Sequence, residues 1–345
     1  MTEFKTPIKN KALDLHDKIT IPPSPFLNRL GYGTGVNVMQ LVRSPRAGQI
    51  RSPWALKMLN KRVKPNRVYT DRLKAEADLL QRMSHPNIVG FRAFSKAKIL
   101  YLGMEACDVS LGDMIEKRIE DDGEPFLPRQ ILKVASDIAS ALDYLHTKMQ
   151  ILHGDMKSYN ILVNGDFVIC KLCDFGVTLP LDENGVFSNK PLLKIPGTEA
   201  WSAPEVIHGG QISNKTDIWP LGLTIWEMLA LMPPHTQTDD DSLEDSVQCL
   251  DDTMDSVGDY FSDRYGKFNK YESRELRTLG ICYSFIIIFS GTRPPVPVNI
   301  SEKQYAHPLA LFYCCTETMA SMRPSAQHLA IAAQDMMEQC DKTGR

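Results

Sequence analysis

The sequence reads LHGDMKSYN at residues 152–160 and LCDFG at residues 172–176. Between these stretches an apolar run leads to the turn residues NGD at 164–166, and a second apolar run returns over 167–172. Asn-Gly between two apolar runs is typical of a tight β-hairpin. Closing this hairpin brings the end of the first stretch next to the second.

The polar residues of the two stretches have the chemistry that phosphoryl transfer requires. Two carboxylates, a lysine and an asparagine lie within 20 positions, namely Asp155, Lys157, Asn160 and Asp174. Such a cluster supplies hard oxygen ligands for Mg²⁺ and a carboxylate to accept the proton of an attacking hydroxyl. The alternative is a polar loop between two buried strands, with the aspartates as turn formers. The two motifs together, at this spacing, favour the chemical interpretation.

In order and spacing, these motifs resemble the catalytic loop and metal-binding turn of eukaryotic protein kinases, His-Arg-Asp-x-Lys-x-x-Asn followed by Asp-Phe-Gly. The resemblance implies that Asp155 is the catalytic base, that Lys157 steadies the transferring phosphate, and that Asn160 and Asp174 bind magnesium. One departure is Gly154, which stands where the family has an arginine. That arginine commonly pairs with a phosphate on the activation segment, so the sequence does not predict control by such a phosphate.

The resemblance also implies an α+β fold with two lobes. We expect a small N-terminal lobe, made of an antiparallel sheet and one helix, and a larger, mainly α-helical C-terminal lobe. The expected organisation is a flexible arm over residues 1–25, an N-terminal lobe over 26–103, a C-terminal lobe over 104–338 and a tail over 339–345.

Length and composition indicate a folded intracellular protein. The chain has 345 residues, 43% of them hydrophobic, which suits a two-lobed domain of about 250–300 residues with tails. A net charge of −3 and a pI near 6.3 give no electrostatic reason to expect nucleic-acid or membrane partners. The eight cysteines form no regular framework and no signal sequence opens the chain, which predicts a reduced, intracellular compartment. The expected location is the cytoplasm and the nucleus.

Two residues of the arm, Thr6 and Ser24, precede a proline and are candidate phosphorylation sites. The run TPIK at residues 6–9 matches the form that proline-directed, cell-cycle kinases prefer, and Ser24 with Pro25 matches it more weakly. Such short matches are common by chance, but the arm is expected to be accessible. We therefore expect an upstream mitotic kinase to act at Thr6.

A glycine-rich turn between two strand-like segments is the expected lid over ATP. Glycines let backbone N–H groups approach phosphate oxygens without a Cβ in the way. By itself the pattern also fits an ordinary hairpin, and Val36 stands where the family has its third glycine. The resemblance places these residues at the nucleotide: Gly31, Tyr32, Gly33, Thr34, Gly35, Val36 and Val38.

Lys57 ends an apolar run, SPWALK at residues 52–57, that resembles the family's Val-Ala-Ile-Lys. The resemblance implies that Lys57 holds the α- and β-phosphates of ATP. Its implied partner is Glu76 on a helix over residues 69–83, although Asp78 competes for this role and Glu76 can also be an exposed helix residue. Further implied nucleotide contacts are Ala55, the gatekeeper Met104 and the backbone groups of Glu105 and Cys107.

Residues 174–205 match the family's activation segment and its closing Ala-Pro-Glu. The resemblance implies a buried ion pair between Glu205 and Arg323, with a large loss of stability if one partner is removed. It also implies that Asp217 braces the backbone of the catalytic loop. Thr198, together with the catalytic-loop lysine, argues for serine/threonine rather than dedicated tyrosine specificity.

Two prolines are expected to begin helices of the C-terminal lobe. Pro128 precedes apolar residues that recur at helical spacing. Pro220 is expected in the first turn of a very apolar helix over residues 221–231, where a missing N–H costs little.

Cys170 and Cys173 form a C-x-x-C motif, which can indicate redox chemistry. They lie in the strand that enters Asp174 and not at the start of a helix. Buried strand residues are therefore the favoured interpretation.

Two segments have no counterpart in the kinase pattern. Residues 239–263 contain ten acidic residues and no lysine or arginine, which favours a solvated, flexible insert over a docking surface for basic partners.

Residues 266–290 pass from a basic-polar run into ICYSFIIIF at 281–289, which is too short for a membrane span. We expect a translated intron or a gene-model artefact; a real segment would be a buried or an aggregation-prone strand.

Further motifs narrow the resemblance to a subfamily of mitotic serine/threonine kinases related to MAP-kinase kinases. They include FKTP at 4–7, SPF at 24–26, HGD at 153–155, PLDEN at 180–184 and GTRPP at 291–295. The resemblance implies stress-activated MAP kinases as substrates. The subfamily's C-terminal PDZ-binding tail is not evident, because KTGR at 342–345 lacks the terminal hydrophobic residue of such a tail. PDZ binding is therefore not expected.

Two other classes of function stay open. A pseudokinase scaffold is suggested by Gly154, Val36 and the unexplained segment 266–290. A pure interaction protein would work through the acidic segment. The presence of all four residues of the expected machinery favours an active kinase, because scaffolds often lack one: Lys57, Asp155, Asn160 and Asp174.

Overall fold

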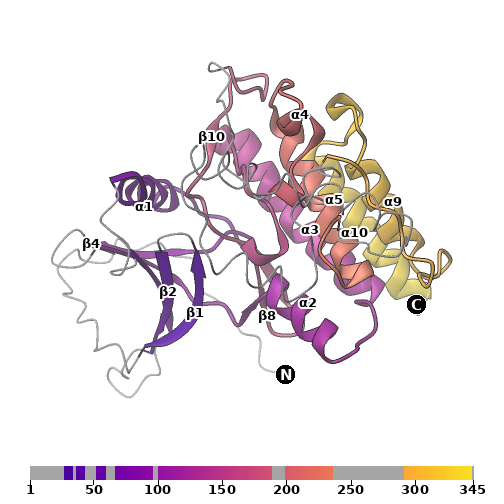
Figure 1. Ribbon diagram of the computed structural model, residues 1–345, viewed down its shortest axis with the longest axis horizontal. Coiled ribbons are helices and arrows are strands. Elements are labelled where there is room, and N and C mark those ends of the chain that lie inside the picture. Colours follow the sequence, from indigo (N-terminus) through magenta and orange to yellow (C-terminus); the bar gives the residue numbers. More distant parts are fainter. Residues whose placement is uncertain are drawn as a thin grey trace, which may run out of the picture.

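The computed structural model describes residues 27–33, 36–42, 52–59, 67–95, 100–188, 199–235 and 291–343 (Figure 1). Several expected features lie outside the described residues: the arm over 1–25 with Thr6 and Ser24, Thr34 and Gly35 of the glycine-rich turn, Thr198, and the segments 239–263 and 266–290.

The N-terminal lobe is an antiparallel sheet with one helix against it. Within the described ranges its strand order is β1-β2-β3-β5-β4. The strands are β1 (Asn28–Gly33), β2 (Val36–Leu41), β3 (Trp54–Leu59), β4 (Phe91–Ser95) and β5 (Tyr101–Glu105). Helix α1 (Arg67–Leu80) contributes Leu73 and Leu80 to the buried cluster that includes Leu102 of β5.

The two faces of strand β3 differ: one carries apolar side chains, and the other carries the candidate functional residue Lys57. Trp54 and Leu56 pack with Tyr101 in a small apolar cluster. Because side chains alternate along a strand, Ala55 and Lys57 point to the other side of the sheet. This is the side on which α1 lies, so the lysine faces the interior of the molecule and not solvent.

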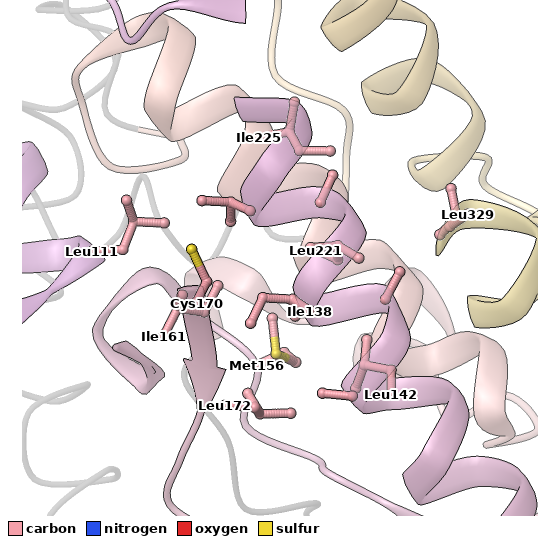
Figure 2. Close-up of a cluster of buried hydrophobic side chains, with 14 of the residues drawn as sticks. Leu111, Ile138, Leu142, Met156, Ile161, Cys170, Leu172, Leu221, Ile225 and Leu329 are labelled. Atoms are coloured by element: carbon pink, nitrogen blue, oxygen red, sulfur yellow. The ribbon is translucent and has the colours of Figure 1, made fainter. Parts of the chain in front are cut away.

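The C-terminal lobe is mainly helical, and its long helix α3 lies among the other elements of the lobe (Figure 1). The α-helices in its described part are α2 (Leu111–Glu120), α3 (Pro128–Tyr144), α4 (Pro204–Ile207), α5 (Ile218–Ala230), α9 (Ala306–Cys315) and α10 (Ala326–Thr343). Pro128 begins α3, and Pro220 lies in the first turn of α5, as the sequence predicts. Figure 2 shows Ile138 and Leu142 in one buried cluster with Met156, Leu172 and Leu221.

The hairpin beneath the catalytic motifs is present, but its turn is longer than the sequence suggests. Strands β8 (Ile161–Asn164) and β9 (Ile169–Leu172) pair antiparallel, with Asn164 opposite Ile169. The expected return strand from residue 167 is therefore wrong by two positions. Phe167 adopts a left-handed φ of 53° and packs its ring edge-on against Phe126, so it belongs to the turn and the core.

The fold class is confirmed: a small antiparallel-sheet lobe with one helix adjoins a larger, mainly helical lobe. Strands β6 (Val109–Ser110) and β7 (Ile151–Leu152) belong to short sheets of the larger lobe. Among the helices in the described part of the chain, none combines the length and apolar composition needed to cross a membrane.

Candidate active site

Lys57 stands at the centre of a three-membered charge cluster. Its Nζ lies 2.9 Å from Glu76 Oε2 and 2.8 Å from Asp174 Oδ1. Strand β3 positions the lysine and α1 positions the glutamate, and both side chains are buried. Asp78, the competing candidate on α1, is exposed. The helix therefore turns Glu76, and not Asp78, toward Lys57.

Charge pairing keeps both ends of the Lys57–Asp174 contact ionised. Burial opposes ionisation of Asp174, but the ammonium of Lys57 outweighs burial and lowers the pKa of Asp174 to about 2. Burial also opposes the charge on Lys57, but Glu76 and Asp174 together raise the pKa of Lys57 above its ordinary value. At neutral pH Asp174 therefore presents a carboxylate, the form that binds a metal ion.

The catalytic loop, residues 152–160, holds its three polar side chains together. Lys157 Nζ lies 3.2 Å from Asp155 Oδ2. The Asn160 amide donates to the backbone carbonyl of Asp155 at 2.7 Å and to Asp155 Oδ2 at 3.2 Å. The Cys173 N–H donates to the carbonyl of Asn160 at 2.9 Å. This last bond places the loop directly beside the residue that precedes Asp174.

The Asn160 and Asp174 side chains fit a divalent metal ion. Mg²⁺ is usually held by one or two protein carboxylates together with water and substrate phosphates. Asn160 directs its amide nitrogen to Asp155, which leaves its amide oxygen for a ligand. The Asp174 side chain is 42% exposed and commits Oδ1 to Lys57, so Oδ2 is the oxygen left for a metal. Two protein ligands suit an ion that arrives with phosphates.

Asp217 of the segment before α5 braces the catalytic loop from below, as predicted. Its carboxylate accepts from the N–H of His153 at 2.8 Å and from the N–H of Gly154 at 3.0 Å. The ring nitrogen Nε2 of His146 lies 2.9 Å from the same group. Burial opposes ionisation of Asp217, but His146 outweighs it, so the pKa of Asp217 lies below its ordinary value.

Gly154 has a backbone conformation that side chains disfavour. Its φ is 79°, and a Cβ added there would lie 3.2 Å from the carbonyl oxygen of Val177. Both the left-handed φ and this close approach suit glycine. The missing arginine is therefore compatible with an ordered catalytic loop.

The expected nucleotide residues lie along adjacent strands of the N-terminal sheet. Val38 of β2 pairs directly with Lys57 of β3, and Ala55 pairs with Met104 of β5. Cys107 follows β5 as a buried thiol, whose pKa burial raises to about 12. The remaining described candidates are Gly31, Tyr32 and Gly33 on β1, Val36 on β2 and Glu105 on β5.

Glu105 makes side-chain contacts that sequence reasoning did not predict. Its Oε2 accepts from the N–H of Gly90 at 3.1 Å and from Lys171 Nζ at 3.2 Å. Lys171 is buried on β9, so the contact joins a strand of the N-terminal lobe to the hairpin of the C-terminal lobe. The signal for it in the sequence is a lysine inside an apolar strand.

A second missed residue is Glu227 of α5. It is buried and accepts two hydrogen bonds, from Ser158 Oγ at 3.0 Å and from Trp201 Nε1 at 2.7 Å. It is the one charged side chain in the described helix α5, whose other residues are almost all apolar. That isolated charge in an apolar helix is the signal by which the sequence could have revealed it.

The pKa of Glu227 provides a test of this buried network. Burial raises the pKa to about 8, and the hydrogen bonds from Trp201 and Ser158 only partly offset it. The folded protein therefore binds a proton that the unfolded chain releases near pH 4.5, so this group makes stability fall as pH rises from about 4.5 to 8. We expect Glu227→Gln to lose less stability than the wild type between pH 5 and pH 8, measured by thermal unfolding. Parallel pH profiles for the two proteins would contradict this.

The C-x-x-C motif has no sign of thiolate chemistry. Burial raises the pKa of Cys170 to about 12 and that of Cys173 well above its ordinary value. Reactive cysteines are thiolates near neutral pH, whereas these two are held as thiols. Cys170 is buried in β9, and Cys173, just past the end of that strand, is partly buried against the same hydrophobic cluster.

The predicted pair of Glu205 and Arg323 is confirmed. Arg323 Nη1 and Nη2 each lie 2.7 Å from one carboxylate oxygen of Glu205, a bidentate contact. Arg323 also stacks over the ring of Trp219 at 5.1 Å. The pair fixes the end of the activation segment to the helical lobe.

Comparisons with known proteins agree with this geometry. A family model described as "Protein kinase domain" matches residues 26–330. The human lymphokine-activated killer T-cell-originated protein kinase is 39% identical to the chain over 97% of the chain and 98% of that protein. Rat mitogen-activated protein kinase kinase kinase 12 is 34% identical over 48% of the chain and 17% of that protein. Human serine/threonine-protein kinase Nek5 is 34% identical over 47% of the chain and 22% of that protein.

Proposed function

Because the chain belongs to the protein kinase family, we propose that it transfers the γ-phosphate of ATP to serine and threonine hydroxyls of protein substrates. The observation that supports this best is the contact of Lys57 with both Glu76 and Asp174, at 2.9 and 2.8 Å. It joins the nucleotide-side sheet, the helix α1 and the metal-binding turn in one cluster. A kinase needs these three parts in place at once.

Each residue of the cluster has a role in the proposed reaction. Lys57, held by Glu76, binds the α- and β-phosphates, and Asp174 with Asn160 holds Mg²⁺. The metal ion, when bound, supplies positive charge beside the phosphates. Asp155 orients the substrate hydroxyl and accepts its proton, while Lys157 offsets charge on the γ-phosphate. Positioning and electrostatics account for most of the acceleration in such a site.

The test of this function is Asp155→Asn. Loss of a positioned general base lowers kcat by roughly 10²–10⁴-fold. We expect this decrease for transfer of radiolabelled phosphate from ATP to a generic basic substrate and to a MAP kinase, with the affinity for ATP unchanged. Equal activity of wild type and variant would contradict the assignment of Asp155.

We also propose the finer function that the subfamily resemblance implies. The chain acts as a mitotic, MAP-kinase-kinase-like enzyme on stress-activated MAP kinases, in the cytoplasm and nucleus, and a proline-directed kinase acts on it at Thr6. The likeness to the human T-cell-originated kinase over nearly the whole chain supports this, as do the partial matches to mitogen-activated protein kinase kinase kinases. Preferential phosphorylation of a stress-activated MAP kinase over the generic substrate would support the substrate class.

A pseudokinase scaffold is the alternative that Gly154 and Val36 suggest. The geometry favours catalysis, because Gly154 leaves the loop braced by Asp217 and the Lys57 cluster is complete. The acidic segment of the third hypothesis, residues 239–263, lies outside the described residues. Magnesium-dependent ATP binding with transfer separates an enzyme from both alternatives.

A further inference from the structure

The first half of the activation segment contains a turn over residues 182–188 that one carboxylate organises. Asp182 Oδ1 accepts from the backbone N–H groups of Asn184 and Val186, each at 2.9 Å. Its other oxygen, Oδ2, accepts from the Ser188 hydroxyl at 2.8 Å. The backbone closes the same turn, because the N–H of Asp182 donates to the carbonyl of Val186 at 2.8 Å. Three of these four hydrogen bonds depend on the Asp182 side chain.

This turn is docked on the segment that carries the brace of the catalytic loop. The N–H of Phe187 donates to the carbonyl of Ile212 at 3.0 Å. The N–H of Asn214 donates to the carbonyl of Gly185 at 2.8 Å. Asn214 begins the short 3₁₀ helix that ends at Asp217, whose carboxylate holds the catalytic loop. Loss of the turn would therefore loosen the support of that loop.

The residues just before the turn are fixed to the catalytic loop from the other side. Strand β10 (Leu179–Pro180) pairs with β7, the strand that runs into the catalytic loop. The N–H of Leu181 donates to the carbonyl of Gln150 at 2.8 Å. The unmodified chain supplies every group in these contacts, so this half of the activation segment is ordered without a phosphate.

Ser188 is exposed, and its hydroxyl bonds a charged group. The N–H of Val186 and the hydroxyl of Ser188 hold the pKa of the Asp182 carboxyl below its ordinary value, so this group is ionised at neutral pH. Phosphoserine carries a charge of about −1.5 to −2 at neutral pH, and beside a carboxylate it disrupts structure by repulsion. Gly154 offers no cation to a phosphate on this segment.

We propose that Ser188 is an inhibitory phosphorylation site: a phosphate on its hydroxyl lies against the Asp182 carboxylate and opens the turn that holds the activation segment beside the catalytic loop. This regulation rests on the function proposed above. A second kinase transfers the γ-phosphoryl group of ATP, which forms a P–O bond to Ser188 Oγ and breaks the bond to ADP. The hydroxyl proton that was donated to Asp182 leaves in that step. Phosphorylation thus replaces a hydrogen bond with a repulsion at the same oxygen.

Four substitutions separate charge from shape. Ser188→Asp adds a negative charge beside Asp182, whereas Ser188→Asn is its neutral match and keeps an N–H that can donate. Asp182→Asn removes the other charge but keeps a carbonyl oxygen for the two backbone N–H groups. The double variant combines Ser188→Asp with Asp182→Asn, so that a carboxylate again meets a donor and the turn closes.

The first measurement is hydrogen exchange of the segment 182–188, followed by mass spectrometry on the full chain. We expect faster exchange, roughly tenfold or more, in Ser188→Asp and in the chain with phosphoserine installed at position 188, because a hydrogen bond to a charged group is lost. In steady-state transfer, kcat/KM for the protein substrate should fall by a similar factor, with the KM for ATP unchanged. Ser188→Asn, Asp182→Asn and the double variant should match the wild type in both measurements.

Several results would overturn the proposal. One is unchanged or slower exchange in the phosphoserine protein, and another is faster exchange without loss of transfer. A third is a double variant as impaired as Ser188→Asp, which would show that the effect does not pass through Asp182. The exchange measurement needs no catalysis. A wild type without transfer, but with faster exchange that the double variant reverses, would overturn the proposed function and leave the response of the turn to charge in place.

Discussion

Asp174→Asn is expected to reduce phosphoryl transfer to the background of the assay while the protein stays folded. The substitution removes the carboxylate that Lys57 and a magnesium ion both need, and it leaves a neutral amide in the same volume. The backbone at this position has a φ of 64°, a region that asparagine tolerates well. Lys57 keeps its contact with Glu76 at 2.9 Å, so the buried ammonium is not left without a partner.

The measurement is transfer of radiolabelled phosphate to a protein substrate, with thermal unfolding of the same samples. Asp166→Asn is the matched control, because Asp166 is an exposed carboxylate in the hairpin turn that accepts from Gln130 at 3.1 Å. We expect the control to retain activity. Full activity in Asp174→Asn would refute the assignment of Asp174 to the metal.

Arg323→Leu is expected to lower the free energy of unfolding by about 3–5 kcal/mol, because it leaves the Glu205 carboxylate, whose side chain is only 9% exposed, without its cationic partner. The guanidinium also donates to the backbone carbonyls of Glu317 at 2.7 Å and Lys215 at 3.0 Å. Those acceptors lose their partner as well. Urea unfolding followed by fluorescence measures the loss.

Arg129→Leu is the control for this prediction. Arg129 also pairs with a carboxylate, Asp341 at 2.8 Å, but its side chain is 60% exposed and that of Asp341 is 53% exposed. Surface ion pairs contribute about 0–1 kcal/mol, so this substitution should hardly change stability. Similar losses of unfolding free energy in the two variants would show that burial does not determine how much the Glu205–Arg323 pair stabilises the protein.

The sequence predicted those parts of the site whose residues lie close together along the chain. The catalytic loop and the metal-binding turn are separated by one hairpin, so their meeting follows from a short-range pairing. Glu76 could be chosen over Asp78 by aligning its helix to the family motif, which the sequence HPNIV at residues 85–89 resembles. The pair of Glu205 and Arg323 spans 118 positions, and only the resemblance to a known family could predict it.

The contacts that the sequence did not predict are made between side chains that lie far apart along the chain. Phe167 resembles a strand residue in a linear pattern, but its packing against Phe126 draws it into the turn. Glu227 and Lys171 are charged residues inside apolar segments, so the pattern could have marked them as unusual but could not say what they contact. Their partners come from distant segments, 69 and 66 positions away for Ser158 and Glu105, so no local signal names them.

The brace at Asp217 has a consequence for how slowly the catalytic loop exchanges amide hydrogens with solvent. Its single carboxylate holds the N–H groups of His153 and Gly154 and contacts the His146 ring. Neither N–H can exchange with solvent unless its hydrogen bond to the Asp217 carboxylate breaks. Asp217 directly precedes the buried helix α5. The two protons should therefore exchange together and as slowly as the hydrophobic core, although they lie in a loop.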